Sequence, residues 1–183
     1  MSALPKRMSL DEFLDWEERQ ELRYEYDGVS AQAMTGGTVA HADLLSNLMG
    51  ILSARQRGGP CRVYGQGLKV RTSTSVRYPD VFVVCAPRSA KATVSPDPIV
   101  IFEILSPSTA RIDLGAKNAE YQTLETLRRY VVLRQDTTFA DVFFRDTEGE
   151  WTHEQIGVDG ALNMPEIGVE VPLSELYEGV QLP

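Results

Sequence analysis

The stretch IVIFEIL, residues 99–105, decides the fold of this chain, because it is apolar at every position except Glu103. A continuous apolar run is typical of a strand covered on both faces of a sheet, whereas a strand with one face in water alternates polar and apolar residues. The stretch therefore predicts a central, buried strand in a domain that contains both helices and strands.

Downstream of this strand, the pattern predicts a helix, a second buried strand and a meander. Residues 110–128 carry apolar side chains at helical spacing, and residues 130–133 form another apolar run. A strand, a helix and a strand in succession imply a right-handed crossover between parallel strands. Residues 139–145 and 151–156, separated by a turn at Glu148-Gly149, predict two more strands that extend the sheet.

Upstream, the chain begins with signals for a helix and a hairpin. Ser9 and Glu12 fit a capping box at the start of a helix that ends near Gln20. Asp27-Gly28 is a strong hairpin signal between strands expected over 23–26 and 29–34.

A second helix is expected over 39–57, ended by Gly58-Gly59-Pro60. Residues 61–70 and 79–85 then predict two strands joined by the polar loop 72–75. The expected fold class is α/β, a mixed α+β arrangement with a central mixed sheet flanked by helices and a C-terminal β meander.

The composition is that of an ordinary folded protein of one domain. A chain of 183 residues suits a single domain over 1–183, and 43% hydrophobic against 24% charged residues excludes collagen, coiled coils and disordered chains. No window reaches the ~20 apolar residues of a membrane span, and the N-terminus lacks the apolar core of a signal peptide. We therefore expect a cytoplasmic protein without a membrane partner, in which Cys61 and Cys85 are reduced, packed thiols.

The net charge of −8 is unevenly distributed along the chain. Residues 1–90 hold eleven basic and ten acidic residues, which leaves seven of the 18 basic and sixteen of the 26 acidic residues for 91–183. The segment 55–88 has one acid, Asp80, and seven basic residues. These are Arg55, Arg57, Arg62, Lys69, Arg71, Arg77 and Arg88. The segment is either an ordinary basic surface or an anion-binding face for nucleic acid.

Two acids stand out because of their apolar surroundings. Glu103 lies inside the apolar strand, where a lone carboxylate is costly unless a cation compensates it. Asp80 follows Pro79 and opens the run Val-Phe-Val-Val-Cys, so its carboxylate is expected at a strand end. Taken singly, Asp80 could cap a turn and Glu103 could pair with Arg77 or Lys117. Together, the two acids indicate a shared site.

The chain resembles the Uma-two family of bacterial endonucleases, a branch of the PD-(D/E)xK restriction-endonuclease-like superfamily. The resemblance covers roughly residues 20–145, the expected nuclease-like core. It rests on Tyr24-Glu25-Tyr26-Asp27-Gly28, His41, Pro79-Asp80-Val81, Glu103-Ile104-Leu105-Ser106-Pro107-Ser108-Thr109, Asp113, Lys117, Tyr121 and Arg129-Tyr130-Val131-Val132-Leu133. The order of these motifs is more specific than any one of them.

The resemblance implies a metal-dependent endonuclease acting on DNA, in which Asp80 and Glu103 hold Mg²⁺ or Mn²⁺. The main-chain carbonyl of Ile104 is a further expected ligand. Glu25 matches an acidic position of the family upstream of the Asp-Gly turn, where it is expected either to assist through a metal-bound water or a second ion, or to be a solvated strand residue. Oxygen ligands suit a hard cation, and Mg²⁺ is usually held by only one or two carboxylates plus waters and substrate phosphate.

The position of the catalytic lysine departs from the superfamily pattern. Leu105 stands where a lysine is usual, two positions after the second acid. The resemblance moves this role to Lys117 on the following helix, with Lys69 as the reserve candidate. Asp113, Lys117 and Tyr121 are spaced four apart, so an ordinary helix salt bridge is the alternative. His41, Tyr121 and Asp113 are expected accessory residues of the site.

Expected DNA contacts come from the basic segment. They are Arg55, Arg57, Arg62, Lys69, Arg71 and Arg77. We also expect a homodimer, because nucleases of this type pair two sites and the meander offers strand edges. Two other hypotheses stay open: a nuclease-fold binding module with little or no catalysis, and a purely structural role for the acids. The substrate form, the recognition sequence and the biological context are not encoded in recognisable motifs.

Overall fold

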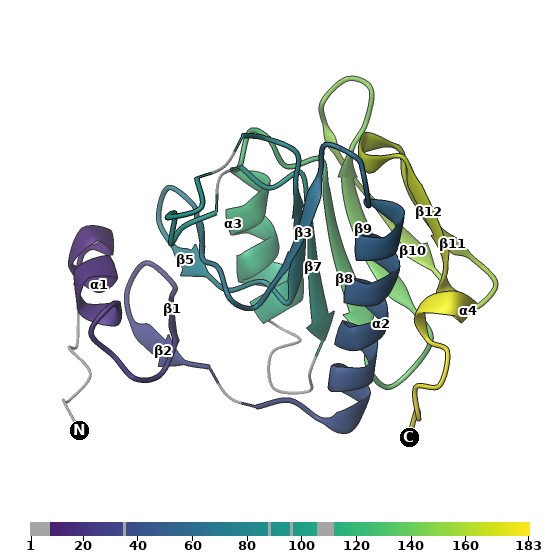
Figure 1. Ribbon diagram of the computed structural model, residues 1–183, viewed down its shortest axis with the longest axis horizontal. Helices are drawn as coiled ribbons and strands as arrows, with labels where there is room; N and C mark the ends of the chain where they lie inside the picture. Colours follow the sequence, from purple (N-terminus) through teal and green to yellow (C-terminus); the bar gives the residue numbers. More distant parts are fainter. Residues whose placement is uncertain (1–7, 35, 88, 96, 106–111) are drawn as a thin grey trace.

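The computed structural model describes residues 8–34, 36–87, 89–95, 97–105 and 112–183, and a six-stranded mixed sheet forms its centre (Figure 1). Arg88 and the Ser-Pro-Ser-Thr motif at 106–109 lie outside the described residues. The strand order is β10-β9-β8-β7-β6-β3. The strands are β3 (Arg62–Gly65), β6 (Val81–Val84), β7 (Val100–Leu105), β8 (Arg129–Arg134), β9 (Ala140–Arg145) and β10 (Trp151–Ile156).

The predicted parallel crossover is confirmed. β7 and β8 pair in parallel, whereas the other neighbours in this sheet pair antiparallel. β7 is fully buried apart from Leu105, as its apolar sequence predicts. Its side chains alternate between two cores, with Val100 and Phe102 on one face and Ile101 on the other. Glu103 therefore points to the same face as Ile101.

Helices cover both faces of the sheet (Figure 1). α2 (Val39–Arg55) packs on one face through Leu44, Leu48 and Leu52, beside β11 (Ala161–Met164), η2 (Pro165–Ile167), β12 (Val169–Pro172) and α4 (Leu173–Leu176). The other face is covered by η1 (Ile112–Lys117), a π-helical segment, and α3 (Asn118–Gln122), whose Tyr121 is fully buried. None of the helices in the described part of the chain has the length and apolar content needed to cross a membrane.

A smaller unit at the N-terminus stands beside the α3 face. α1 (Leu10–Glu17) begins at the predicted Ser9–Glu12 capping box, and its Phe13 stacks on Tyr26. β1 (Tyr24–Tyr26) and β2 (Ala31–Ala33) form the predicted hairpin, with Gly28 at a positive φ of 90°. The hairpin joins β5 (Val76–Arg77) and β4 (Val70–Arg71) in a second sheet of order β2-β1-β5-β4.

Two predicted elements differ from the observed ones. The expected strand pair 61–70 and 79–85 is split, because the loop 72–75 joins β4 to β5 in the second sheet while β3 pairs with β6 in the first. The helix expected over 110–128 ends at Gln122. The Thr123 hydroxyl donates to the Glu120 carbonyl and the Thr126 hydroxyl to the Pro98 carbonyl, and such side-chain bonds to the backbone compete with helix continuation.

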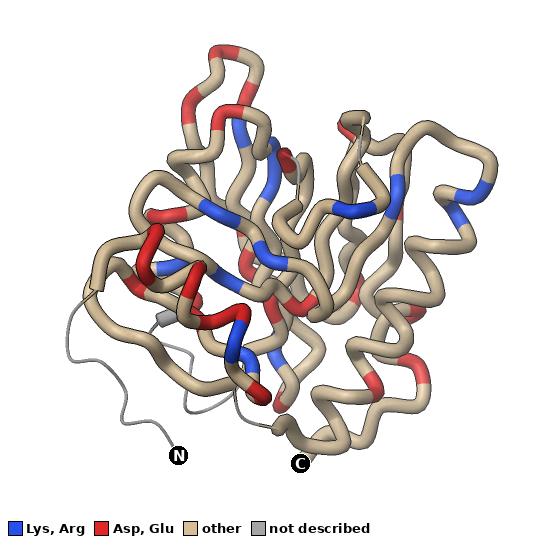
Figure 2. The backbone as a smooth tube through the Cα atoms, turned by 60° about the vertical axis from the view of Figure 1, so that its left-hand side comes forward, with Lys and Arg blue, Asp and Glu red and all other residues tan. Residues whose placement is uncertain are grey.

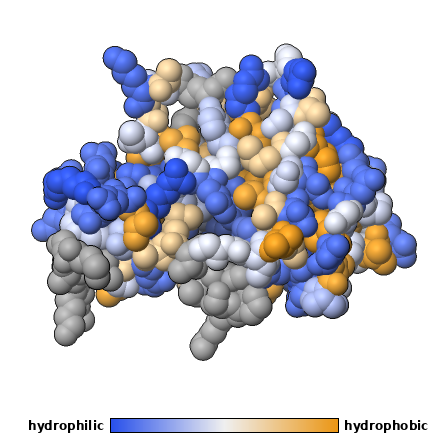
Figure 3. All heavy atoms as spheres, turned by 60° about the horizontal axis from the view of Figure 1, so that its bottom comes forward, coloured by the Kyte–Doolittle hydropathy of each residue, from blue (hydrophilic) through white to orange (hydrophobic). Residues whose placement is uncertain are grey.

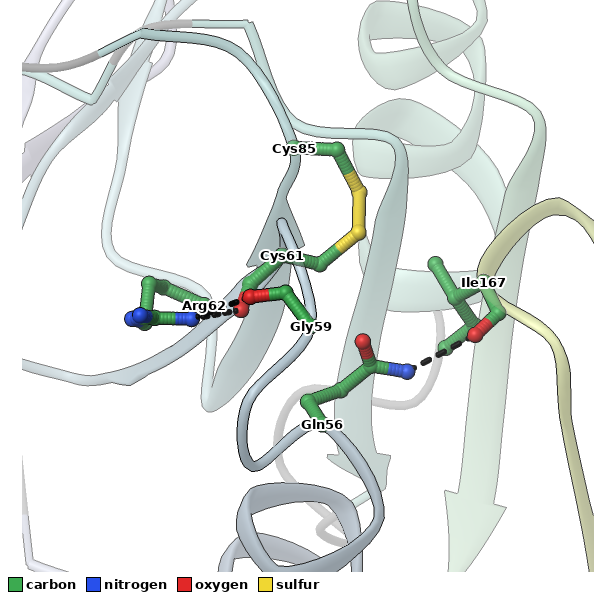
Figure 4. Close-up of a disulfide and its surroundings, with 6 residues drawn as sticks. All are labelled: Gln56, Gly59, Cys61, Arg62, Cys85 and Ile167. Carbon is green, nitrogen blue, oxygen red and sulfur yellow. Dashed lines mark hydrogen bonds between the residues drawn. A yellow bond between two sulfur atoms is a disulfide. The ribbon is translucent and has the colours of Figure 1, made fainter.

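The expectation of two reduced cysteines is wrong: Cys61 and Cys85 form a disulfide (Figure 4). Arg62 pairs with Val84 across β3 and β6, so the next pair along the same antiparallel ladder is Cys61 and Cys85. Side chains of directly opposed residues point to the same face of a sheet and lie within reach of each other. A separation of 24 positions in the sequence hid this proximity, because it spans the excursion into the second sheet.

Candidate active site

The two acids predicted from their apolar context lie side by side. Val81 pairs with Phe102 across β6 and β7, and one step further along this ladder Asp80 comes opposite Glu103. Both side chains therefore project from the face that η1 and α3 cover. Opposed residues in an antiparallel pair have Cβ atoms ~5 Å apart, which brings two carboxylates into direct electrostatic contact. The charge of Asp80 accordingly adds to burial, the larger cause, in raising the pKa of Glu103.

Asp80 accepts hydrogen bonds at both carboxylate oxygens. The Ile104 backbone N–H donates to Oδ2 at 2.7 Å, and Gln66 Nε2 donates to Oδ1 at 2.5 Å. His41 Nε2 lies 3.3 Å from Oδ1. Burial alone would raise the pKa of Asp80, but the contacts with His41, Ile104 and Gln66 outweigh it and lower that pKa. Asp80 is therefore an ionised carboxylate at neutral pH.

Glu103 is less exposed to solvent than Asp80. Its Oε1 accepts from Lys117 Nζ at 3.1 Å and from the Tyr121 hydroxyl at 3.0 Å. Burial raises the pKa of Glu103 to about 8, against the opposing charge of Lys117 and with the support of neighbouring carboxylates. Asp80 and Glu103, whose pKa values are shifted in opposite directions, thus lie in one site, and such perturbed pKa values are frequent in active sites.

Lys117 is the cation at the centre of the site. Its Nζ lies 3.1 Å from Glu103, 3.3 Å from Asp113 and 3.4 Å from Glu25. Burial by itself would lower the pKa of Lys117, but the charges of Glu103, Glu25 and Asp113 raise it above its ordinary value. The lysine is held protonated. With the predicted spacing of four, Lys117 forms the i,i+4 ion pair with Asp113, and Lys117 and Tyr121 both contact Glu103.

Glu25 reaches this site from the second sheet. Its Oε1 accepts from the Tyr78 backbone N–H at 3.0 Å, and its Oε2 lies 3.3 Å from Arg77. Arg77 in turn binds the two carboxylate oxygens of Glu120 on α3, each at 2.8 Å. The small N-terminal sheet is therefore connected to α3 through Arg77, and it positions Glu25 beside Lys117.

A cavity of about 620 Å³ opens onto these groups. Glu25, Asp80, Glu103 and Asp113 line it together with two permanent cations, Arg77 and Lys117, so acids outnumber these cations by two. His41 lies at its wall next to the N-terminus of α2, where the Thr38 hydroxyl caps the helix. Figure 3 views the molecule from the end at which β7 finishes, and hydrophilic and hydrophobic residues are interleaved on this face.

The other predicted residues are placed elsewhere or are paired within the protein. Lys69 Nζ lies 2.6 Å from Glu17 of α1, and Arg77 is buried between Glu25 and Glu120. Arg55 pairs with Glu175, and Arg71 pairs with Asp11. Arg62 donates to the carbonyls of Gly59 and Cys61 (Figure 4), and Arg57 is exposed after α2. Lys and Arg positions are spread over several parts of the backbone (Figure 2).

Several residues of the site were not predicted. Gln66 donates to Asp80, and the Tyr78 backbone donates to Glu25. Thr38 donates its hydroxyl proton to Gln135, which follows β8 and also lines the cavity. Gln66 directly follows the pair of Gly65 and Val81, so extending this register by one position would have directed attention to Gln66 as a neighbour of Asp80.

The donor set fits a divalent cation. Among the described residues that line the cavity, the acids exceed the permanent cations by two, and burial raises the pKa of Glu103. Within the described ranges, no three His, Cys, Asp or Glu side chains gather into a ready-made metal cage. A pair of carboxylates with a neighbouring carbonyl is nevertheless a sufficient protein contribution for Mg²⁺, which keeps most of its waters.

The chain is similar to known proteins in fold and in sequence. The solved structure of "a putative nuclease belonging to DUF820" from Anabaena variabilis has a TM-score of 0.79 at 16% identity, covering 95% of this chain and 99% of that one, so the fold is shared. The uncharacterized protein slr1290 of Synechocystis is 30% identical over 182 residues, 98% of this chain and 96% of its own length. Residues 10–180 match the family Uma2, described as "Putative restriction endonuclease". The resemblance inferred from the sequence is confirmed, and the chain belongs to the Uma2 family.

Proposed function

We propose that this protein is a metal-dependent endonuclease that hydrolyses phosphodiester bonds in DNA. The observation that carries the proposal is the pair Asp80 and Glu103 on one face of the sheet, in one cavity with the protonated Lys117. Membership in a family described as "Putative restriction endonuclease" supports a nuclease. The acids, the lysine and the cavity supply the groups that phosphoryl hydrolysis needs.

Mg²⁺ or Mn²⁺ would be held by the carboxylates of Asp80 and Glu103, with the main-chain carbonyl of Ile104 as a further ligand. When bound, such an ion lowers the pKa of its water and neutralises charge on the phosphate oxygens. His41, Gln66 and the Ile104 N–H hold the Asp80 carboxylate in place, so its orientation does not depend on the substrate.

Lys117 acts as a charge partner for the phosphate. The carboxylates around it keep its ammonium protonated, so it donates hydrogen bonds to anionic oxygens and does not accept a proton. Glu25 and Asp113 fix the position of its Nζ beside Glu103. A positioned cation of this kind stabilises the charge of a transition state most strongly where water is excluded, as in this buried cluster.

Nicking of supercoiled plasmid DNA tests the proposal. The protein with Mg²⁺ or Mn²⁺ is expected to nick the plasmid, and EDTA is expected to abolish the activity. Asp80→Asn, Glu103→Gln and Lys117→Met should each reduce the rate by at least about a hundredfold. Glu170→Gln, a neutralised acid at an exposed position of β12, is the matched control and should retain activity. Undiminished nicking by identically purified Asp80→Asn would reject the assignment.

A catalytically inactive binding module is the second candidate function. Both oxygens of Asp80 and Oε1 of Glu103 already accept hydrogen bonds from protein donors, which favours a self-satisfied site. Fold alone does not decide between the two functions. Titration calorimetry with Mn²⁺ separates them: the nuclease requires binding that Asp80→Asn removes, whereas the module, like a purely structural acid pair, gives no metal-binding heat.

We also propose that the active form is a homodimer. β10 is the outermost strand of the six-stranded sheet, and an edge strand can pair with a second chain. Two sites related by a twofold axis would address the two strands of a duplex. Light scattering coupled to gel filtration should give the mass of two chains, and a single-chain mass in the nicking buffer would exclude the dimer.

A further inference from the structure

A second cavity of about 880 Å³ lies beside the candidate active site. Tyr64, Gln66, Gly67 and Leu68 line one part of it, and Pro87 and Ala90 belong to another. Among the described residues that line this cavity, none carries a charged side chain. The described part of its lining is therefore unlike that of the acidic cavity next to it, and this part offers an uncharged, partly apolar surface to a ligand.

The two cavities share Gln66 as a lining residue. The side chain of Gln66 donates to Asp80. Tyr64 lies two residues before Gln66 and, like it, projects from the face of the sheet that carries Asp80, since Tyr64 pairs with Phe82. Two residues of extended chain span about 7 Å. A ligand group against Tyr64 would thus lie close to a reacting phosphate at Asp80.

Tyr64 offers a rigid aromatic surface in this position. Its ring stacks on Phe82, with centroids 5.4 Å apart and planes 24° apart, and Phe82 is fully buried. Tyr64 itself is only half-buried. The groove around it therefore combines an immobilised aromatic ring, a proline, small side chains and glycine backbone, a combination that suits a flat heteroaromatic ring.

We propose that this groove binds a nucleobase of the substrate strand, next to the phosphate that is cut. This inference rests on the proposed function and specifies its substrate. A base inside a duplex is stacked and paired, and reaching the groove would require its extrusion, which costs free energy. The enzyme consequently prefers single-stranded DNA, or DNA with an unpaired base at the cleavage site. In both substrates the base can enter the groove without extrusion from a duplex.

Two variants test the groove without touching the acidic site. Tyr64→Leu removes the stacking surface but keeps an apolar contact with Phe82. Gly67→Leu narrows the groove, and it is compatible with the fold because a Cβ at Gly67 meets no atom within 4 Å and the backbone is outside the positive-φ region. Gly157→Leu is the matched control, since Gly157 is equally open and lies between β10 and β11.

The experiment measures binding separately from cleavage. A fluorescein-labelled oligothymidylate of about ten nucleotides, its abasic counterpart and a duplex of equal length are titrated with protein in EDTA, with fluorescence anisotropy as the readout. The wild type and Gly157→Leu should bind the oligothymidylate about tenfold more tightly than the abasic strand, as expected for one stacked base. Tyr64→Leu and Gly67→Leu should bind the two strands equally. Retention of the tenfold preference in either variant overturns the proposal.

Failure of this inference can be told apart from failure of the proposed function. Loss of base-dependent binding in both variants supports the groove even if no divalent ion produces cleavage. Conversely, metal-dependent cleavage by the wild type with an unchanged KM for single-stranded DNA in both variants leaves the nuclease standing and removes the groove. Circular dichroism melting confirms that each variant is folded before it is scored.

Discussion

Lys117 has an unusual setting for a surface-prone residue, because three carboxylates surround its buried ammonium. Replacing it by methionine leaves Glu25, Glu103 and Asp113 without their shared cation. Loss of one partner from a buried ion pair typically costs about 3–5 kcal/mol, because the remaining charge stays buried. We expect Lys117→Met to lower the free energy of unfolding by about 3 kcal/mol, measured by urea denaturation in EDTA.

A double variant supplies the control for this prediction. Adding Glu103→Gln to Lys117→Met removes one of the buried acids left without a cation, so the combined loss should be smaller than the sum of the two single losses. Strict additivity would show that Lys117 and Glu103 do not interact, in contradiction to their 3.1 Å separation.

Asp141 makes stability depend on pH at a position remote from the acid pair in the sequence. Burial alone would raise the pKa of this carboxyl, but hydrogen bonds from Gln155, Arg134 and His153 outweigh it and lower the pKa. A depressed folded-state pKa stabilises the fold above the ordinary value of 3.8, and this contribution is lost as the pH falls through the folded-state pKa.

Asp141→Asn should therefore lower the free energy of unfolding by about 2 kcal/mol near neutral pH. The difference between wild type and variant should shrink as the pH falls below 3.8. Thermal denaturation over a series of pH values measures it. A difference that stays constant on acidification would show that the ionised carboxylate contributes nothing.

At the scale of elements, the disulfide fastens β3 to β6 (Figure 4). A cross-link between residues 24 positions apart removes conformational freedom from the unfolded chain, which corresponds to about 3 kcal/mol. Reduction, or the double change Cys61→Ser with Cys85→Ser, should lower the free energy of unfolding by roughly that amount. Dithiothreitol should leave the melting temperature of the double variant unchanged, and an equal effect on both proteins would contradict the assignment.

The elements with strong local signals were predictable from sequence. The Ser9–Glu12 capping box, the Asp27-Gly28 turn and the buried strand β7 depend on neighbouring residues, and each is present. β4 and β5 were missed because strands of two residues have no readable periodicity. β5 pairs with the distant β1 and β4 pairs with β5, and local sequence does not record the pairing with β1.

The site was predictable only in part, for the same physical reason. Glu103 and Asp80 stood out because charge in an apolar run must be compensated. The resemblance supplied Lys117 and Glu25, and the structure brings both to Glu103 or its lysine partner. The contacts of Gln66 and of the Tyr78 backbone N–H depend on strand register and main-chain position, which cannot be inferred from the type of a single residue. Lys69 carried the right charge but lies beside Glu17.

For the whole molecule, charge placement predicts weak salt dependence of DNA binding. The chain has a net charge of −8, and four of the six basic residues expected to contact DNA are ion-paired within the protein. The slope of log K against log salt concentration reflects the number of phosphates neutralised, at about −0.7 each for single strands. We expect a slope no steeper than about −2, measured by anisotropy in EDTA over a potassium chloride series.

A steep slope would identify a basic contact surface that the paired arginines do not provide. Repeating the series with Arg57→Gln tests an exposed arginine whose position after α2 leaves it open to solvent. An unchanged slope in this variant is expected if most of the affinity comes from the candidate active site and the neighbouring groove.

The opposition of Asp80 and Glu103 across β6 and β7 has a consequence for how such chains can diverge. The paired strands hold the two acids together. The connection over 85–99 can therefore become longer without moving the acids, because the entropy cost of closing a loop rises only slowly with its length. A single residue inserted within β6 would instead turn Asp80 toward the opposite layer, because side-chain direction alternates at every position. Length variation in this protein is therefore tolerated between the strands and forbidden within them.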